Sequence, residues 1–343
     1  MAPLVSVLMP VFDAAALLPE CLAGIRAQTM EDFELVAVDD GSQDESGRLL
    51  EEAAADDSRV VPIRAAHQGI VGALNRGLAA CRGQFIARMD ADDRMHPERL
   101  AAQLAYLEQH PRCDLAGCWV APYGIGKPLT PGAIRYHDWL NSLAGDGEIK
   151  TNLFVDSPIA HSTFFARAEL FRRLGGYRDC AWAEDYDFLF RAALAGATFG
   201  NVPRVLLDRG DRVDRLTRTD RRYRRRPMFE AKAHYFAKGR WLDGRRGVVV
   251  AGSGPSGRVV AGALRREGVA VRCFVDNRPG PAGRTVMGIP AHGAKEPFPN
   301  ALLEKYRDAF VLLCIGDKAG RNQVAERLSG LGLRPGKDFL RFI

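Results

Sequence analysis

The stretch "QFIARMDADDRMHPERL", residues 84–100, decides the fold because it joins a strand to a helix through a cluster of acids. The run 84–89 is apolar enough for a strand that is buried on both faces. Asp90, Asp92 and Asp93 follow it at once. Ionised carboxylates roughly 6 Å apart repel by up to about 3 kcal/mol at an effective dielectric constant near 20. Acids that repel one another at the end of a buried strand therefore indicate a functional site.

Strands and helices alternate around this stretch over the first 120 residues. Apolar runs predict strands, buried on both faces, at 4–9, 33–39, 59–63, 84–89 and 113–120. The segments between them predict helices at about 15–28, 44–55, 70–81 and 97–109. This alternation implies right-handed crossovers and a parallel, doubly wound sheet. Ligands of such sheets bind beyond the carboxyl ends of the strands.

The unusual residues of the first domain gather at those carboxyl ends. Four segments follow the first four predicted strands in turn: Pro10–Asp13, Asp39–Ser42, His67–Ile70 and Asp90–Asp93. Acids that converge on one rim, with glycines that let the backbone approach a ligand, indicate a nucleotide and a cation. Mg²⁺ or Mn²⁺ takes carboxylate and phosphate oxygens as ligands.

The pattern changes twice after residue 120. The segment 122–160 is less periodic and is expected to be a loop with one short helix near 132–143. The α/β alternation restarts after residue 246, with strands expected at 247–251, 269–275 and 309–315 and helices at 255–267, 300–307 and 318–331. We therefore expect a first domain at 1–236, a linker at 237–246 and a smaller α/β domain at 247–343.

Length and composition are those of an ordinary globular protein. The chain has 343 residues, of which 47% are hydrophobic and 26% charged, enough for two domains with their own cores. No apolar run reaches the length of a membrane span, and the first residues predict a strand instead of a signal peptide. Seven cysteines without a C-x-x-C pair indicate a reduced, cytoplasmic protein.

The net charge of +6 is concentrated in one run, Arg204–Arg226, where ten arginines face four acids. Three interpretations stay open: a solvated face, contacts to a phosphorylated ligand, and docking on anionic lipid at the inner face of a membrane. Nucleic acid is not expected to be a partner, because no DNA- or RNA-binding motif accompanies the run.

Five segments together resemble the family 2 glycosyltransferases, which have the GT-A fold. They are "VSVLMPVFD", "QTMEDFELVAVDDGSQDES", "QGIVGALNRGLAACRGQFIARMDADDRMHPERL", "SPIAHSTFFARAELFRRLGGYRD" and "AEDYDFLFRAALAG". They keep the family's order and spacing over residues 4 to about 207. The resemblance implies inverting transfer of a sugar from a nucleoside diphosphate, usually UDP, assisted by Mn²⁺ or Mg²⁺.

The resemblance also implies roles for single residues. Asp92 looks like the direct metal ligand, and Asp90 would support it through water or the sugar hydroxyls. Asp40 resembles the carboxylate that accepts a hydrogen bond from the base. The residues implied in nucleotide-sugar binding are Pro10, Phe12, Asp40, Asp90, Asp92 and Asp93. Two departures are Asp13, where the family commonly has Asn, and Asp156, where close relatives often carry Glu.

Asp185 in "AEDYD" is the expected catalytic base. An acceptor hydroxyl must lose its proton as it attacks the anomeric carbon, and a carboxylate within hydrogen-bond reach can take that proton. Acids at this place could instead complement a helix dipole, and Glu184 is the less favoured base. His161 is a candidate near the acceptor or diphosphate, or a structural histidine. Trp182 could stack on a sugar ring or belong to a core.

The second domain contains a Gly-rich turn between a predicted strand and helix. Gly252, Gly254 and Gly257 have the G-x-G-x-x-G spacing, and Asp276 ends the next predicted strand. This context is typical of a dinucleotide-binding turn. The segment also resembles the small Rossmann-like modules attached to some sugar-modifying transferases, which implies an accessory nucleotide-binding or structural domain.

The leading hypothesis is therefore a cytoplasmic, metal-dependent, inverting glycosyltransferase. Its donor would be a nucleotide sugar, and its acceptor a hydroxyl of a glycan, a lipid-linked molecule or a small molecule. The alternatives are an NAD-dependent oxidoreductase that works through the C-terminal domain, and a non-catalytic nucleotide-sugar binding protein. Asp90, Asp92 and Asp185 argue against the second alternative, because a binding protein has no need of a base.

Overall fold

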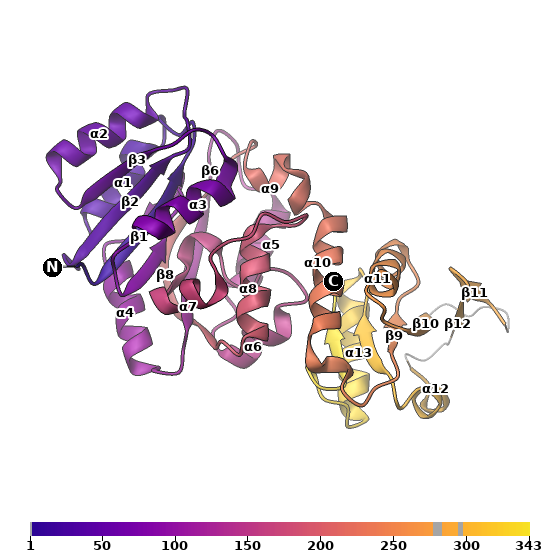
Figure 1. Ribbon diagram of the computed structural model, residues 1–343. Helices are drawn as coiled ribbons and strands as arrows, with labels where there is room; N and C mark the ends of the chain where they lie inside the picture. The colour runs from indigo at the N-terminus through magenta and orange to yellow at the C-terminus, as the bar shows by residue number, and fades with distance from the viewer. Residues whose placement is uncertain (1, 277–282, 294–297) are drawn as a thin grey trace. The chain divides into compact units, whose positions relative to one another are not determined.

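The computed structural model describes residues 2–276, 283–293 and 298–343, which form two compact units (Figure 1). The first unit comprises residues 1–149, 158–180 and 184–219, and the second comprises 150–157, 181–183 and 220–343. The second unit thus includes a helix, Arg225–Lys238, that lies mostly before the boundary expected at residue 236.

The first unit is built on an eight-stranded sheet with the order β3-β2-β1-β4-β7-β6-β8-β5. Its strands are β1 (Val5–Val11), β2 (Phe33–Asp39), β3 (Val60–Arg64), β4 (Phe85–Arg88), β5 (Arg94–Met95), β6 (Leu115–Gly124), β7 (Phe165–Arg167) and β8 (Phe199–Asp211). β1 to β4 are mutually parallel, as predicted.

The expected all-parallel sheet is wrong in its second half. β7 runs antiparallel to both β4 and β6, and β5 runs antiparallel to β8. β7 is three residues long, and β5 is two, so neither leaves a periodic signal in the sequence. The expectation that every strand is buried on both faces also fails for β3, because it is the edge strand and four of its five residues are partly or fully exposed.

The helices of the first unit agree with the predicted ones to within a few residues up to position 109. They are α1 (Leu18–Arg26), α2 (Ser46–Asp56), α3 (Gly69–Ala80), α4 (Arg99–Gln109), α5 (Pro131–Leu140), α6 (Asp146–Asn152), which extends into the second unit, α7 (Ala168–Leu174), α8 (Glu184–Leu194) and the short α9 (Leu216–Thr219). The segment 122–160 contains two helices, α5 and α6, and the end of β6, where the sequence predicted one helix.

α3 shows why these residues form this layer. Val71 and Leu74 are buried on one face of the helix, three residues apart. On the same face a Cβ atom at Gly77 would lie 2.2 Å from Leu8 Cδ1 of β1, so glycine allows the helix to approach the sheet. Residues of β1, β2, β4 and β6 form the main core beside it. The packed sheet gives the carboxyl ends of β1, β2 and β4 a fixed position.

The second unit contains a six-stranded sheet with the order β11-β12-β10-β9-β13-β14. Its strands are β9 (Val248–Ala251), β10 (Val271–Asp276), β11 (Thr285–Val286), β12 (Ile289–Gly293), β13 (Phe310–Leu313) and β14 (Phe339–Arg341), and its longer helices are α10 (Arg225–Lys238), α11 (Pro255–Arg266), α12 (Asn300–Lys305) and α13 (Lys318–Gly330). All pairs are parallel except β11 with β12. Each strand and helix predicted here has its counterpart.

None of the helices in the described part of the chain has both the length and the apolar character needed to cross a bilayer.

Candidate active site

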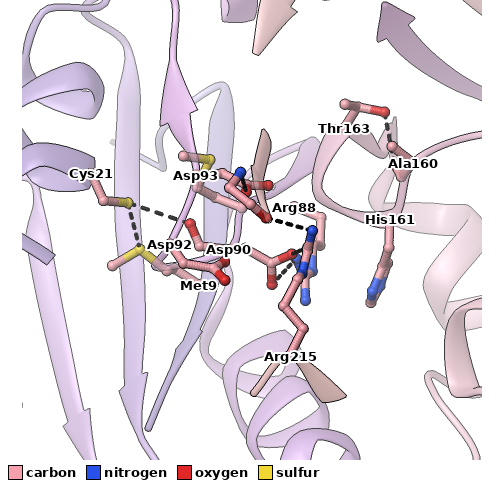
Figure 2. A network of polar contacts seen from close by, with 12 residues as sticks. Met9, Cys21, Arg88, Asp90, Asp92, Asp93, Ala160, His161, Thr163 and Arg215 are labelled. Carbon is pink, nitrogen blue, oxygen red and sulfur yellow. Dashed lines mark hydrogen bonds and ion pairs between the residues drawn. The ribbon is translucent and has the colours of Figure 1, made fainter. Parts of the chain in front are cut away.

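Three acids follow β4 and lie together. Asp90, Asp92 and Asp93 each offer a carboxylate oxygen within 4.8 Å of the others (Figure 2). A turn brings them together, in which the Asp93 amide donates to the Asp90 carbonyl at 3.3 Å. The Cys21 thiol of α1 lies 3.5 Å from the same carbonyl. The clustering predicted from the sequence is therefore present in the folded chain.

Arginines that the sequence analysis did not single out as site residues lie against these acids. Arg88 of β4 forms an ion pair with Asp90, and Arg215 approaches the other oxygen of Asp90 at 3.7 Å (Figure 2). Arg212 lies 3.5 Å from Asp92. Arg88 is 2% exposed, and a charged residue inside a predicted buried strand was the signal that could have identified it.

The acids differ in how readily they ionise. Burial would raise the pKa of Asp90, but Arg88 and Arg215 lower it to about 2. Burial, with the charge of Asp90, raises the pKa of Asp92. Burial and the two neighbouring acids raise the pKa of Asp93 to about 7. Asp90 is therefore ionised at neutral pH, whereas Asp92 and Asp93 lose their protons less readily than a free aspartate.

The cluster fits a divalent cation. Asp93 Oδ1 accepts a hydrogen bond from the Gly210 amide at 2.9 Å, whereas its buried Oδ2 makes no hydrogen bond to any described residue. A set of carboxylate oxygens, one of them buried without a donor, is the ligand chemistry that Mg²⁺ and Mn²⁺ prefer. Such an ion would also favour the ionised forms of Asp92 and Asp93.

The turn after β2 holds Asp40 firmly. The amides of Gln68 and Gly69 donate to its two carboxylate oxygens at 2.9 and 2.8 Å, and His67 Nδ1 lies 2.9 Å from Oδ2. Of about four acceptor positions on a carboxylate, three are used. One position is left for the nucleobase contact that the resemblance implies for Asp40.

An exposed aromatic pair stands at the same rim. Phe12, 44% exposed, lies 4.4 Å from the His67 ring between centroids. Pro10 is a partly exposed residue of β1, paired with Val38. Asp13, where the family commonly has Asn, has a φ of 45° and accepts a hydrogen bond from the Gln43 amide at 2.8 Å. A flat apolar surface beside a polar turn can hold a nucleoside.

Asp185 lies in the first turn of α8. It is partly buried, and its carboxylate accepts a hydrogen bond from the amide of Tyr186 at 2.7 Å. Burial and the neighbouring Glu184 raise the pKa of Asp185 to about 7, against a weaker opposite effect of Arg88. A carboxyl group with this pKa can exchange a proton near neutral pH, which is what a general base requires.

His161 is buried in a short 3₁₀ helix, His161–Thr163. Its Nε2 lies 2.8 Å from the Tyr177 hydroxyl, and its Nδ1 lies 4.0 Å from Glu184. Burial and the charge of Arg88 lower its pKa well below the usual value, so the ring is neutral. Because Arg88 influences Asp90, His161 and Asp185, the three belong to one electrostatic network.

The remaining predicted residues lie in the second unit. The ring of Trp182 is 5.2 Å from that of His234 between centroids. At the Gly-rich turn, a Cβ atom at Gly257 would lie 1.9 Å from the Gly252 carbonyl oxygen, while nothing lies within 4 Å of one at Gly254. The Ser253 hydroxyl donates to Asp276 at 2.5 Å.

The arginine run divides between the units. Arg212, Arg215 and Arg218 lie in the first unit and pair with acids, Arg218 with Asp211 at 2.6 Å. The residues from Asp220 onward belong to the second unit. A wholly solvated face is therefore wrong for the first part of the run, since the side chain of Arg215 is only 11% exposed.

Comparison with protein families gives one match at this site. Residues 6–175 match the family model described as Glycosyl transferase family 2. The match includes the three clustered acids and His161 but ends before Asp185.

Curated proteins of bacteria resemble part of the chain. An uncharacterized glycosyltransferase of Haemophilus influenzae is 31% identical over 214 residues, which are 60% of this chain and 64% of that protein. The amylovoran biosynthesis glycosyltransferase AmsE of Erwinia amylovora is 30% identical over 193 residues, 55% of this chain and 69% of AmsE. The chain spans only 34% of another relative, the uncharacterized glycosyltransferase EpsJ of Bacillus subtilis.

Solved structures share the fold. TarS of S. aureus (residues 1–349), in a crystal structure with UDP-GlcNAc, superposes with a TM-score of 0.55 at 18% identity, over 70% of this chain and 67% of that one. The likeness shows a GT-A fold, as expected from the sequence. Nothing in these names favours the oxidoreductase alternative.

Proposed function

Because this chain belongs to glycosyltransferase family 2, we propose that it transfers a sugar from a nucleoside diphosphate sugar to an acceptor hydroxyl, with inversion at the anomeric carbon. The donor is a UDP-sugar. The acceptor is a glycan, a lipid-linked molecule or a small molecule.

One observation carries this proposal: a carboxyl group with a pKa of about 7, Asp185, shares an electrostatic network with the acid cluster. Inversion in one step needs a base on one side of the sugar and a stabilised leaving group on the other. Asp185 takes the proton of the attacking hydroxyl. Removal of that proton by a positioned base contributes roughly 10²–10⁴-fold to the rate.

The acid cluster serves the leaving group. Asp92 would hold Mn²⁺ or Mg²⁺ directly, and Asp90 would orient a water of the cation or the sugar hydroxyls. When bound, the cation offsets the charge that grows on the departing diphosphate. Asp93 completes the oxygen-rich pocket through its free buried oxygen.

The rim of β1 and β2 binds the nucleoside. Phe12 and Pro10 offer an apolar surface to it, and Asp40 uses its remaining acceptor position for the base. The TarS structure contains UDP-GlcNAc, a donor of the class that we propose here. His161, neutral and paired with Tyr177, positions Glu184 at the acceptor side.

The second domain, 247–343, is an accessory module that binds a nucleotide or serves the structure. The close approach at Gly257 and the open space at Gly254 support a binding turn. Trp182 is a candidate for stacking on a sugar ring.

We place the reaction in the cytoplasm or at the inner membrane surface. No disulfide joins the cysteines, all seven of which lie in the described residues, and this supports a reducing compartment. The arginines between positions 221 and 226 are candidates for contact with anionic lipid.

A donor screen tests the function. The protein is incubated with Mn²⁺ and UDP-, GDP- or dTDP-sugars, and release of the nucleoside diphosphate is measured with and without a chelator. The proposal expects release from UDP-sugars that stops when the cation is removed. Release that ignores the chelator contradicts the metal role, and no release from any donor contradicts the activity.

A further inference from the structure

The end of β8 is fastened to the acid cluster, and the segment Arg212–Arg218 follows it directly. The Gly210 amide donates to Asp93 Oδ1 at 2.9 Å. A Cβ atom at Gly210 would lie 2.5 Å from the Asp92 carbonyl oxygen, so no other residue allows this approach. The Tyr123 hydroxyl donates to the same carbonyl at 2.9 Å. The side chains of this segment are therefore delivered directly to the acids.

Two of those side chains lie against the acids. Arg212 Nε lies 3.5 Å from Asp92 Oδ2, and Arg215 Nη2 lies 3.7 Å from Asp90 Oδ2. Both distances are longer than those of a charge-assisted hydrogen bond. Arg212 Nε also lies 3.2 Å from Asp214, and Arg215 Nη1 donates to the Gly210 carbonyl at 2.6 Å. Each arginine thus has a second anchor on its own segment.

Charge counting shows what these contacts do. Three guanidinium groups, those of Arg88, Arg212 and Arg215, already lie against two of the three acids, Asp90 and Asp92. A divalent cation that enters alone adds two positive charges beside these guanidinium groups in a partly buried place, which is unfavourable. The diphosphate of a nucleotide sugar brings about two negative charges, which offset those of the cation.

We propose that Arg212 and Arg215 form an interlock that makes the cation and the diphosphate bind as a pair. In the empty site the two arginines occupy Asp92 and Asp90 and suppress binding of the cation alone. When cation and donor enter together, the cation takes the carboxylates and the two arginines turn to the diphosphate. This inference rests on the proposed function, because it needs both ligands at the acid cluster.

Arg88 is not part of the interlock. It lies on β4, is fully buried, and its contact with Asp90 is fixed by the strand. Arg212 and Arg215 lie on the segment after β8, and their contacts with Asp92 and Asp90, at 3.5 and 3.7 Å, are longer and weaker than a charge-assisted hydrogen bond. The interlock therefore predicts that replacing both arginines strengthens binding of the cation alone and weakens binding of the diphosphate.

The test measures Mn²⁺ binding by electron paramagnetic resonance of the free ion, with and without UDP. The wild type is compared with the double variant Arg212→Gln/Arg215→Gln. A matched control is Arg218→Gln, because Arg218 lies on the same segment but pairs with Asp211. A charge-conserving variant, Arg212→Lys/Arg215→Lys, shows whether charge suffices, and thermal melting confirms that each variant is folded.

The expected result is that the double Gln variant binds Mn²⁺ alone about tenfold more tightly than the wild type, since two competing charges are gone. The same variant should bind UDP in the presence of Mn²⁺ about tenfold more weakly. By linkage, with UDP binding in the absence of the cation unchanged, the factor by which UDP increases Mn²⁺ affinity must then fall by about tenfold. Arg218→Gln and the double Lys variant should behave like the wild type toward Mn²⁺ alone.

Two outcomes overturn the interlock. In the first, the double Gln variant is folded and both proteins bind Mn²⁺ with UDP, but the variant binds Mn²⁺ alone no better than the wild type. This result refutes the interlock and leaves the proposed function standing. If neither protein binds Mn²⁺ with UDP, the proposed function fails and the interlock fails with it.

Discussion

The role of Asp185 can be tested by one substitution, Asp185→Asn. The change removes the proton acceptor but keeps the size of the side chain and its hydrogen-bond acceptor for the Tyr186 amide. Loss of a general base lowers turnover roughly 10²–10⁴-fold, which is about 3–5 kcal/mol of transition-state stabilisation. Binding of UDP and Mn²⁺ should stay within about twofold of the wild type, because Asp185 has no part in holding either.

The dependence of turnover on pH is a second test of the role of Asp185. Because burial and Glu184 raise the pKa of Asp185 to about 7, its carboxylate is about half ionised at pH 7 and about one-tenth ionised at pH 6. Turnover of the wild type should therefore rise roughly tenfold per pH unit below pH 7 and level off above it. Residual activity of Asp185→Asn should lack this rise.

The raised pKa of Asp185 also predicts the direction in which Asp185→Asn changes the stability of the protein. A carboxyl group whose pKa is raised by folding costs stability once it ionises, so the cost appears as pH rises above the unfolded pKa. Asp185→Asn should therefore melt no lower than the wild type at pH 8.

The assay of activity is release of UDP from the donor. Glu184→Gln is the comparison variant, and it should lose less activity than Asp185→Asn. Equal losses of turnover and of UDP affinity in Asp185→Asn would refute the role of base.

Three further predictions concern other parts of the chain. Phe12→Ala should weaken UDP binding by roughly tenfold, measured by calorimetry, since it removes the exposed ring expected to contact the nucleoside; unchanged affinity would place the nucleoside elsewhere. Gly257→Ala should lower the melting temperature of the second domain, because its Cβ would lie 1.9 Å from the Gly252 carbonyl, whereas Gly254→Ala should not; equal melting of both variants and the wild type would contradict this packing. Association with anionic vesicles should fall with salt if the arginines between 221 and 226 contact lipid, and association that is absent or insensitive to salt would leave them as a solvated face.

The first half of the fold could be predicted because its signals are local. An apolar run that ends in acids identifies β4 and its rim without knowledge of any distant residue. The other three parallel strands give the same apolar signal, and the helices between them bury one face each. Asp185 was predicted as the base from the resemblance to the family, because an acid at the start of a helix can equally complement the helix dipole.

The rest depended on contacts between distant residues. β7 has three residues and takes its place between β4 and β6 only through their backbone pairing. Arg215 contacts Asp90 although the two residues lie 125 positions apart in the chain, and no periodic pattern in the sequence predicts this contact. The arginine run was visible as charge, but its division between site acids and other partners needed three-dimensional placement. Arg88 was the exception, because a guanidinium inside a buried strand is a local anomaly.

We propose that the acids after β4 hold a divalent cation against a diphosphate. A crystal structure of the protein with Mn²⁺ and UDP, with anomalous scattering recorded for manganese, tests it most directly. The account predicts a manganese peak bonded to Asp92 and to diphosphate oxygens, with Asp90 beside it. A map in which UDP is bound but manganese is absent from these acids, with Asp90 and Asp92 still paired to Arg215 and Arg212, would contradict it.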